Sequence, residues 1–309
     1  MIKSENFKKK NILVTGASGL IGPRLIKNLQ EKGNQVSVLS RFPTKLKGVK
    51  AFKWDIENQT IDKSAFNGID TIIHLAGAGI ADKRWTRRRK QLIIDSRVLS
   101  TRLLYNTISE TNSEIKTIIS ASAVGYYGDR RDEILTESSK NGTGFLAQCC
   151  NQWENAVDEG IKYGIRVVKL RIGLVLSKQG GALSELEKPV SLFLGAPLGS
   201  GKQWMPWIHL TDLLAIIDLA IENPEFKGAY NTCAPMPVTN QEFTKLLAKK
   251  LFRPVWPINI PEIVLKTLLG EMSAVVLISN RTLPQKLLDM GFRFRYPGLD
   301  DALSEIYSH

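Results

Sequence analysis

The chain has 309 residues, of which 43% are hydrophobic and 23% are charged, and its formal net charge is +12. This composition is typical of a globular protein with one large domain, or a domain and an appendage, whose core needs no covalent or metal staples. Three cysteines without a CxxC spacing argue against a disulfide framework and a metal site, and no apolar run is long enough to span a membrane, so we expect a cytoplasmic protein with no membrane partner.

Apolar runs of strand length alternate with helical patterns through the first half of the chain. Because these runs are apolar throughout, both faces of the resulting sheet should be covered, which is typical of parallel strands joined by helices. The sequence therefore predicts an α/β fold, a Rossmann-like doubly wound parallel sheet with a smaller C-terminal substrate lobe. The strands are expected at 11–15, 35–39, 49–54, 71–75, 116–120 and 166–170, and the helices at 21–32, 90–111 and 145–163.

Beyond about residue 173 the alternation fades, and glycine and proline become frequent between 180 and 206. Such punctuation is typical of irregular segments that surround a ligand. The expected units are a Rossmann domain over 10–180 with its sheet completed from 205–235, substrate-lobe segments over 181–250, and a small C-terminal module over 251–305.

A glycine-rich turn follows the first predicted strand, where Gly16, Gly19 and Gly22 have GxxGxxG spacing. The first glycine would allow a tight turn, the second a close approach of a pyrophosphate, and the third close packing of the helix on the sheet. Free amides and the positive end of the helix dipole would then hold the phosphates. In its strand–turn–helix context, this spacing predicts a dinucleotide site.

The residues after the second predicted strand indicate which dinucleotide binds. Folds specific for NAD usually place an acidic residue there, whereas this chain has Ser40 and Arg41. A guanidinium suits a 2′-phosphate, and the serine hydroxyl can add a donor, so we predict NADP(H) as the cofactor. Asp55, at the end of the next strand, is expected either to touch the adenine or to form a turn.

Small residues end the strand predicted at 71–75, where Ala76 and Gly77 would let a ligand lie across the sheet edge. His74 has an apolar strand around it, so we expect a core histidine. The basic run at 83–90 has no accompanying nucleic-acid motif, and a solvated helix face is the favoured interpretation. We therefore predict no nucleic-acid partner.

Several longer motifs run through the chain, namely TGASGLIG, HLAGAGIADKRW, SASAVGYYGD, LRIGLVLSKQGGAL, GAPLGSGKQWMPWIHLTDL and NRTLPQKLLDMGFRFRYPGLDDAL. Together they resemble the extended short-chain dehydrogenase/reductases, and more narrowly their "epimerase family" branch, once labelled cell-division-inhibitor homologues. The resemblance covers about residues 10 to 305 and implies an NADP-binding Rossmann domain, a substrate lobe and a small C-terminal module.

The resemblance also assigns residues to the cofactor. Arg41 matches the 2′-phosphate reader. Independently of the resemblance, Arg171 and Val175 follow a predicted strand and are expected to line the nicotinamide side. Arg97 lies where extended members often carry Asn, and it is either a phosphate or substrate ligand or part of a helix salt bridge. The phosphate loop is matched by Gly16, Ser18, Gly19, Leu20 and Ile21, and the loop beside the cofactor by Leu75, Ala76 and Gly77.

In this family a serine positions the reacting oxygen, a tyrosine is the acid/base, and a lysine four residues later lowers the tyrosine pKa. Ser122 fits the serine position, with Ser120 as an alternative. The Tyr-x-x-x-Lys pair is missing, because the matching positions hold Phe145 and Cys149.

Two interpretations of the missing pair stay open. Tyr126 or Tyr127 supplies a relocated acid, or these tyrosines only pack the substrate loop and redox chemistry has been lost. We expect an NADP(H)-dependent oxidoreductase or epimerase acting on a nucleotide-sugar-like or other small carbonyl or hydroxyl substrate. The alternative is a non-catalytic NADP(H)-binding regulatory protein. The oligomeric state is open.

Other residues receive structural expectations. The segment 189–212 should form the substrate wall, in which His209 and Asp212 stabilise the lobe. Trp153 and Glu154, in the middle of a predicted helix, are expected to pack in the core.

Overall fold

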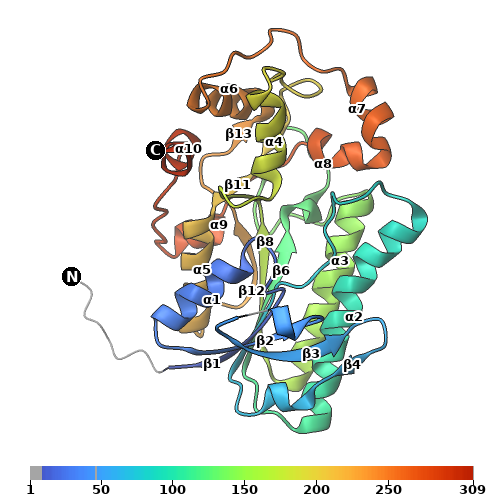
Figure 1. Ribbon diagram of the computed structural model, residues 1–309, viewed down its shortest axis with the longest axis vertical. Coiled ribbons are helices and arrows are strands. Elements are labelled where there is room, and N and C mark those ends of the chain that lie inside the picture. Colours follow the sequence, from blue (N-terminus) through green and yellow to red (C-terminus); the bar gives the residue numbers. More distant parts are fainter. Residues whose placement is uncertain (1–8, 46, 309) are drawn as a thin grey trace, which may run out of the picture.

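The computed structural model describes residues 9–45 and 47–308, with the backbone alone at Lys45. Its centre is an eight-stranded sheet in the order β12-β8-β6-β5-β1-β2-β3-β4, parallel except for the β3–β4 pair (Figure 1). The order reverses at β1, so a crevice opens between β1 and β5 at the carboxyl ends of the strands. This sheet confirms the predicted Rossmann-like α/β fold. The strands are β1 (Asn11–Thr15), β2 (Gln35–Ser40), β3 (Lys50–Asp55), β4 (Thr60–Ile61), β5 (Thr71–His74), β6 (Thr117–Ala123), β8 (Arg166–Ile172) and β12 (Gly228–Thr232).

Helices cover both faces of the sheet. Along β1, Ile12 and Val14 pack in one cluster with α1 and α5, while Leu13 packs in another with α2, as the alternation of side chains along a strand requires. In Figure 1, α1 and α5 lie on one side of the sheet and α2 and α3 on the other. These helices are α1 (Gly22–Glu31), α2 (Arg87–Thr111), α3 (Phe145–Asp158) and α5 (Leu210–Glu222), and α3 continues as a 3-10 turn, η4 (Glu159–Tyr163).

A second lobe stands above the carboxyl ends of the strands (Figure 1). Its own core joins α4 (Ala182–Ser191), α6 (Asn240–Lys250) and α10 (Leu299–Tyr307). Here His209 Nε2 lies 3.0 Å from Glu305 Oε2, and the Asp212 carboxylate accepts the amides of Arg295 and Tyr296 at 2.7 and 3.0 Å. These bonds fix the tail of the chain to β11 (Trp207–His209) and α5.

Short elements complete the lobe and its connections. The strands are β7 (Ile134–Leu135), β9 (Leu174–Leu176), β10 (Trp204–Met205), β11 (Trp207–His209), β13 (Val238–Thr239) and β14 (Arg281–Thr282). The helices are α7 (Glu262–Leu269), α8 (Ala274–Leu277) and α9 (Gln285–Asp289), with 3-10 turns η1 (Pro43–Lys45), η2 (Lys63–Phe66), η3 (Val124–Tyr127) and η5 (Gly270–Ser273).

Two strands run further than their apolar patterns indicate. β6 continues to Ala123 and β8 to Ile172, because the buried Ser122 and Arg171 find polar partners inside the fold. Cys149, Cys150 and Cys233 are buried free thiols. In the described part of the chain, no helix has the length and apolar character needed to cross a membrane.

Candidate functional site

Each of the three glycines of the phosphate loop is glycine for a different structural reason. Gly16 has φ +74°, and a Cβ there would lie 2.7 Å from the Leu75 backbone. A Cβ on Gly22 would lie 2.4 Å from the Ala17 carbonyl oxygen. At Gly19 the nearest atom, the Gly16 carbonyl oxygen, would be 3.4 Å away. The fold itself therefore requires glycine at 16 and 22, whereas position 19 is open toward the space where a ligand would lie.

The start of α1 offers free donors beside this loop. No side chain caps the helix, and its first turn has no acidic residue. Within the described residues, the amides of Leu20 and Ile21 donate to no acceptor. Ser18 and Gly19 are exposed, and Leu20 is covered by Gly181, where a Cβ would lie 2.6 Å from Leu20 Cδ2. The loop after β9 thus reaches the phosphate loop, a contact that the sequence did not indicate.

The residues after β2 and β3 lie along the same edge of the sheet. Arg41 is exposed, and its guanidinium lies 6.0 Å from the Phe42 ring. The half-buried Ser40 accepts the Phe42 amide at 3.1 Å. Asp55 accepts the amides of Glu57 and Asn58 and the Asn58 side chain, which lowers the Asp55 pKa. Asp55 therefore forms the predicted turn, and its contact with the adenine stays a prediction.

His74 organises the loop that follows β5. Thr15 Oγ1 lies 2.8 Å from His74 Nδ1 and accepts the amides of Leu75 and Ala76 at 3.2 and 3.1 Å. On the other side, Ser100 Oγ lies 3.1 Å from His74 Nε2. Burial, and then the nearby Arg97 charge, lower the His74 pKa to about 3. His74 is therefore a neutral core residue that joins β1, β5 and α2.

Arg97 presents a buried cation at this loop. Its Nη1 donates to the carbonyl oxygens of Ala78 and Ile93 at 3.1 and 2.9 Å, and its Cζ lies 5.0 Å from the Trp153 ring. A Cβ on Gly77 would lie 3.1 Å from that Cζ. Nε and Nη2 have no partner among the described residues, and neither is fully enclosed. The guanidinium thus keeps free donors beside Gly77.

Ser122 and Tyr127 belong to a buried polar network. Ser122 Oγ donates to Glu154 Oε1 at 2.8 Å. Arg171 donates to both carboxylate oxygens of Glu154, from Nε at 2.8 Å and from Nη2 at 2.9 Å. The Tyr127 hydroxyl donates to Asn231 Oδ1 at 2.6 Å and accepts Arg171 Nη1 at 2.9 Å. Tyr127 is 0% exposed, and burial raises its pKa to about 12 despite the nearby Arg171 charge. Neither hydroxyl is free for a substrate in this arrangement.

The remaining candidates differ in how far they reach open space. Tyr126 is half-buried, and its ring centroid lies 3.5 Å from the Arg171 guanidinium. Cys149 is buried, and this burial raises its thiol pKa. Val175 pairs with Ile208 between β9 and β11, at the base of the upper lobe. Glu154, expected only to pack, instead carries the charge that joins Ser122 to Arg171.

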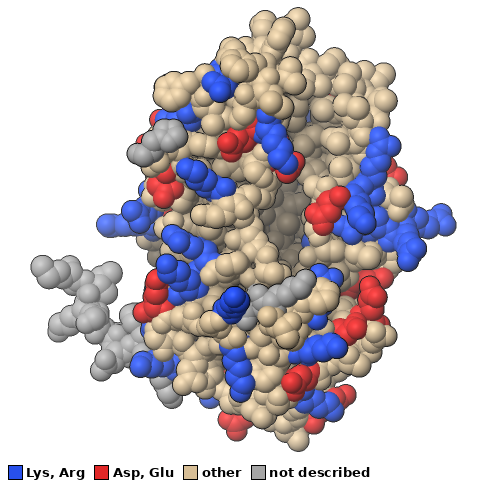
Figure 2. Space-filling model, viewed as in Figure 1, with Lys and Arg blue, Asp and Glu red and all other residues tan. Residues whose placement is uncertain are grey.

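A cleft of about 660 Å³ lies between the two lobes, and Phe145 forms part of its wall. Figure 2 shows a deep hollow between the upper lobe and the part that carries the sheet. From the lower part Trp85 joins Phe145, while Glu262, Lys266 and Glu271 come from the C-terminal segment. Other wall residues are Asp129, Ser200, Gln203, Gly270, Ser273, Ala274, Leu277 and Ile278. The position predicted to hold a catalytic tyrosine therefore does face a ligand-sized space.

Comparisons with known proteins agree with this geometry. The profile of the NAD dependent epimerase/dehydratase family matches residues 12–233, and that of a domain of unknown function, DUF1731, matches 260–306. A relative from Arabidopsis thaliana, epimerase family protein SDR39U1 homolog, chloroplastic, is 36% identical over 312 residues, which cover 99% of this chain and 89% of the relative.

Solved structures are similar over most of the chain. Human epimerase family protein SDR39U1 (isoform2) with NADPH is 29% identical with a TM-score of 0.84, over 97% of this chain and 99% of the human one. The nucleoside-diphosphate sugar epimerase from Corynebacterium glutamicum is 34% identical with a TM-score of 0.79, over 97% of this chain and 58% of that one.

Proposed function

The chain belongs to the NAD dependent epimerase/dehydratase family, and on that premise we propose that it is an NADP(H)-dependent oxidoreductase or epimerase. Its substrate would be a small carbonyl or hydroxyl compound, of which a nucleotide sugar is one candidate. The observation that carries the proposal is the open Gly19 position beside the free amides of Leu20 and Ile21. A pyrophosphate fits such a cradle, because it needs close backbone approach and N–H donors.

Cofactor choice rests on Arg41 and Ser40. No acidic side chain occupies this position, and an exposed guanidinium can form charge-assisted bonds with a 2′-phosphate. The human relative was solved with NADPH, which favours the same choice here. Replacing Arg41 by alanine should weaken NADPH binding by about tenfold or more and leave NADH binding almost unchanged. Calorimetry with both cofactors tests this, with Arg293→Ala as the control for an exposed arginine elsewhere.

Bound NADP(H) would exchange a hydride with the substrate, so the chain must hold the substrate and move a proton. Phe145 has no exchangeable proton, and the hydroxyls of Ser122 and Tyr127 are engaged. Tyr126 is the accessible phenol on the same loop. We assign the proton transfer to Tyr126, and we assign to Arg97 the cation that the family usually places four residues after its tyrosine.

Assays with NADPH or NADP⁺ and a panel of nucleotide sugars and simple carbonyls test this assignment. We expect turnover with at least one compound, a loss of about 100-fold or more in Tyr126→Phe, and a smaller loss in Arg97→Met. Tyr163→Phe, a change at a half-exposed tyrosine far from the cleft, is the matched control. Tyr126→Phe with full activity would remove the assigned acid.

A second function is favoured by the replaced catalytic pair. With Phe145 and Cys149 at the two family positions, the chain would bind NADP(H) and report its presence without turnover. Intact NADPH affinity with no turnover across the panel would select this function. Turnover that disappears in Tyr126→Phe would reject it.

A further inference from the structure

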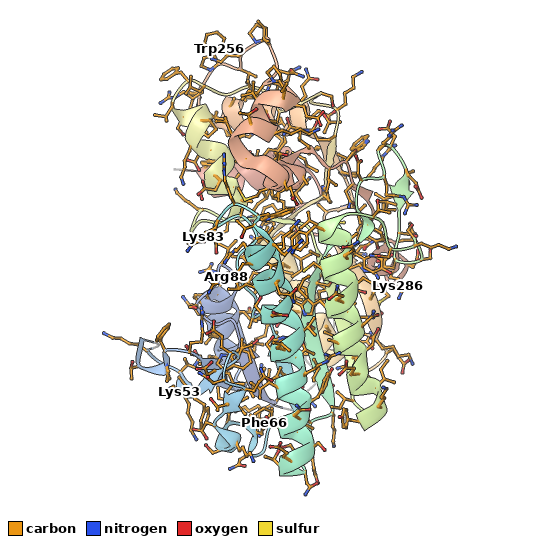
Figure 3. All side chains as sticks on the ribbon, turned by 90° about the vertical axis from the view of Figure 1, so that its right-hand side faces the viewer. Lys53, Phe66, Lys83, Arg88, Trp256 and Lys286 are labelled. Atoms are coloured by element: carbon orange, nitrogen blue, oxygen red, sulfur yellow. The ribbon has the colours of Figure 1, made fainter. Side chains whose placement is uncertain are left out.

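An apolar cap covers the upper end of the molecule, away from the cleft wall and the sheet. It consists of Leu192, Phe193, Leu194, Phe252, Trp256 and Ile258, whose exposed fractions run from 54% to 84%. Figure 3 places Trp256 at the far upper end, well separated from Lys83 and Arg88 near the start of α2. In Figure 2 the atoms at this end are mostly uncharged, with basic side chains at the margin.

The two loops that form the cap are joined by hydrogen bonds into one continuous surface. Trp256 Nε1 donates to the Phe193 carbonyl oxygen at 2.7 Å, and the Trp256 amide donates to Gly195 at 2.8 Å. Arg253 donates to the Ser191 carbonyl oxygen, and its Cζ lies 4.5 Å from the Phe193 ring centroid. The loop after α4 and the loop after α6 are thus held side by side, with their apolar side chains exposed together.

Both phenylalanines stand where the backbone favours glycine. Phe193 has φ +64° and Phe252 has φ +53°. In each case the phenylalanine amide and the next amide donate back to the last turn of the preceding helix, Phe193 to Val190 and Phe252 to Lys249. This is the helix-ending motif whose left-handed position is usually glycine or asparagine. Folding and solubility would both favour those residues, so an exposed phenylalanine at two adjacent helix ends points to a role outside the fold.

The charges around the cap decide which partner fits. Lys245, Lys249 and Arg253 lie on α6 or just after it, and none makes an ion pair within residues 9–45 and 47–308. The acidic side chains of α4 are engaged, Glu185 by Lys188 and Glu187 by the Tyr307 hydroxyl. A second copy of this chain, meeting the cap about a two-fold axis, would bring these cations against their own copies. A surface of negative charge over an apolar interior is complementary to the cap.

We propose that the apolar cap is a membrane-docking surface for anionic phospholipid bilayers. Phe193, Phe252 and Trp256 enter the interface between headgroups and acyl chains, and Lys245, Lys249 and Arg253 contact the lipid phosphates. The sequence predicted no membrane partner because it lacks a spanning segment, and peripheral docking needs none. This inference is independent of the proposed oxidoreductase function.

Vesicle flotation of the full chain tests the proposal. The wild type should float with phosphatidylcholine vesicles that contain phosphatidylglycerol, should not float with phosphatidylcholine alone, and should dissociate as salt rises. The double variant Phe193→Gly/Phe252→Gly should bind about 100-fold less tightly, since each buried aromatic ring contributes about tenfold or more. Its melting temperature should be equal or higher, because glycine relieves the left-handed positions.

Two further variants distinguish vesicle binding through the cap from non-specific adsorption of the protein. At low salt, Lys245→Gln/Lys249→Gln should bind the anionic vesicles about fivefold less tightly for each lysine replaced. Ile161→Ser, a change at an exposed isoleucine at the other end of the molecule, should float like the wild type. Absence of flotation in the wild type, or full flotation of the double phenylalanine variant, would overturn the proposal. So would a wild-type dimer that this variant converts to a monomer without any lipid binding, because the cap would then join two copies.

Discussion

At the scale of single residues, Gly19 separates the demands of the cofactor from those of the fold. Gly16 and Gly22 meet backbone within 3 Å of where a Cβ would stand, whereas Gly19 meets only one carbonyl oxygen at 3.4 Å. Gly19→Ala should therefore leave the cofactor-free melting temperature nearly unchanged. Its methyl group would occupy the space of the pyrophosphate and raise the NADPH dissociation constant by about tenfold or more. Thermal unfolding and calorimetry on the same samples measure both effects.

Gly22→Ala is the contrasting variant. Its Cβ would lie 2.4 Å from Ala17 O and 2.6 Å from Ala17 Cα, so the helix must move away from the loop. We expect a loss of about 1–3 kcal/mol of stability even without cofactor. If Gly19→Ala binds NADPH as tightly as the wild type, the phosphate site does not lie at this glycine.

His74 makes stability depend on pH. In the unfolded chain its imidazole has the ordinary pKa of 6.5, whereas in the folded protein burial lowers that pKa to about 3 and the ring stays neutral. The contribution of neutral His74 to the free energy of unfolding is therefore complete above pH 6.5 and is lost as the pH falls toward 3. By linkage, wild type should lose about 2 kcal/mol more than His74→Gln between about pH 7.5 and about pH 5.

Urea unfolding of both proteins across this range measures the difference. His209→Gln serves as the companion, because burial also lowers the His209 pKa but its partner Glu305 opposes the shift. Parallel stability curves for wild type and His74→Gln would mean that folding leaves the His74 pKa unchanged.

At the scale of elements, a strand and a helix meet through matched spacings. Glu154 and Asp158 are four residues apart on α3, and Lys169 and Arg171 are two apart on β8. Four helical residues rise about 6 Å and two strand residues about 6.7 Å, so the two rows of charge lie opposite each other. Arg171 pairs with Glu154 at 2.8 Å and Lys169 with Asp158 at 2.6 Å. The network fastens α3 to the sheet at the level of Ser122.

Removing one partner should leave a buried charge unpaired. Glu154→Gln is expected to cost about 3–5 kcal/mol, and Glu154→Gln/Arg171→Met should cost less than the sum of the single changes. The more exposed pair Arg102–Glu159 gives the comparison, where Glu159→Gln should cost less than about 1 kcal/mol. Denaturant unfolding of the set forms a double-mutant cycle. An additive double variant would show that the two side chains do not depend on each other.

The element scale also shows what a sequence can and cannot predict. Apolar runs and the glycine loop are local patterns, so β1, α1, β2 and β5 follow from the sequence alone. The link between Glu154 and Arg171 joins two separate elements, and the sequence around each residue does not indicate its partner. The spacings Glu154/Asp158 and Lys169/Arg171 were the available signal, because charges on the inward face of apolar elements need partners. Gly181 against Leu20 gave no local signal, since the contact depends on how the upper lobe sits over the loop.

At the scale of the whole molecule, the cleft is assembled from segments far apart in the chain. Trp85 and Phe145 come from the Rossmann part, and Glu262, Lys266 and Glu271 come from the C-terminal segment. The part that carries the sheet could be predicted from its repeating pattern, and Ser200 and Gln203 come from the segment 189–212 that was predicted as the substrate wall. The contribution of the segment 262–278 could not be predicted, because its position depends on contacts with the other lobe.

One ion pair and two hydrogen bonds join the two walls of the cleft at one side. Lys90, at the start of α2, lies 2.6 Å from Glu271, and Arg84 donates to the carbonyl oxygens of Thr267 and Leu268 at the end of α7. Glu271 is 62% exposed in its side chain, so the ion pair itself contributes at most about 1 kcal/mol. Its effect should therefore be local: it restrains the C-terminal wall without determining whether the chain folds.

Arg84→Ala/Lys90→Ala should leave the melting temperature within a few degrees of wild type and speed hydrogen exchange in the segment 262–277. High salt should produce part of the same increase in the wild type, because it screens the exposed pair. Lys27→Ala, which removes an exposed ion pair on α1, is the matched control and should leave exchange in this segment unchanged. Unchanged exchange in the double variant would mean that packing of Met272 and Ala274 against the cluster around Trp85, rather than these bonds, holds the C-terminal wall in place.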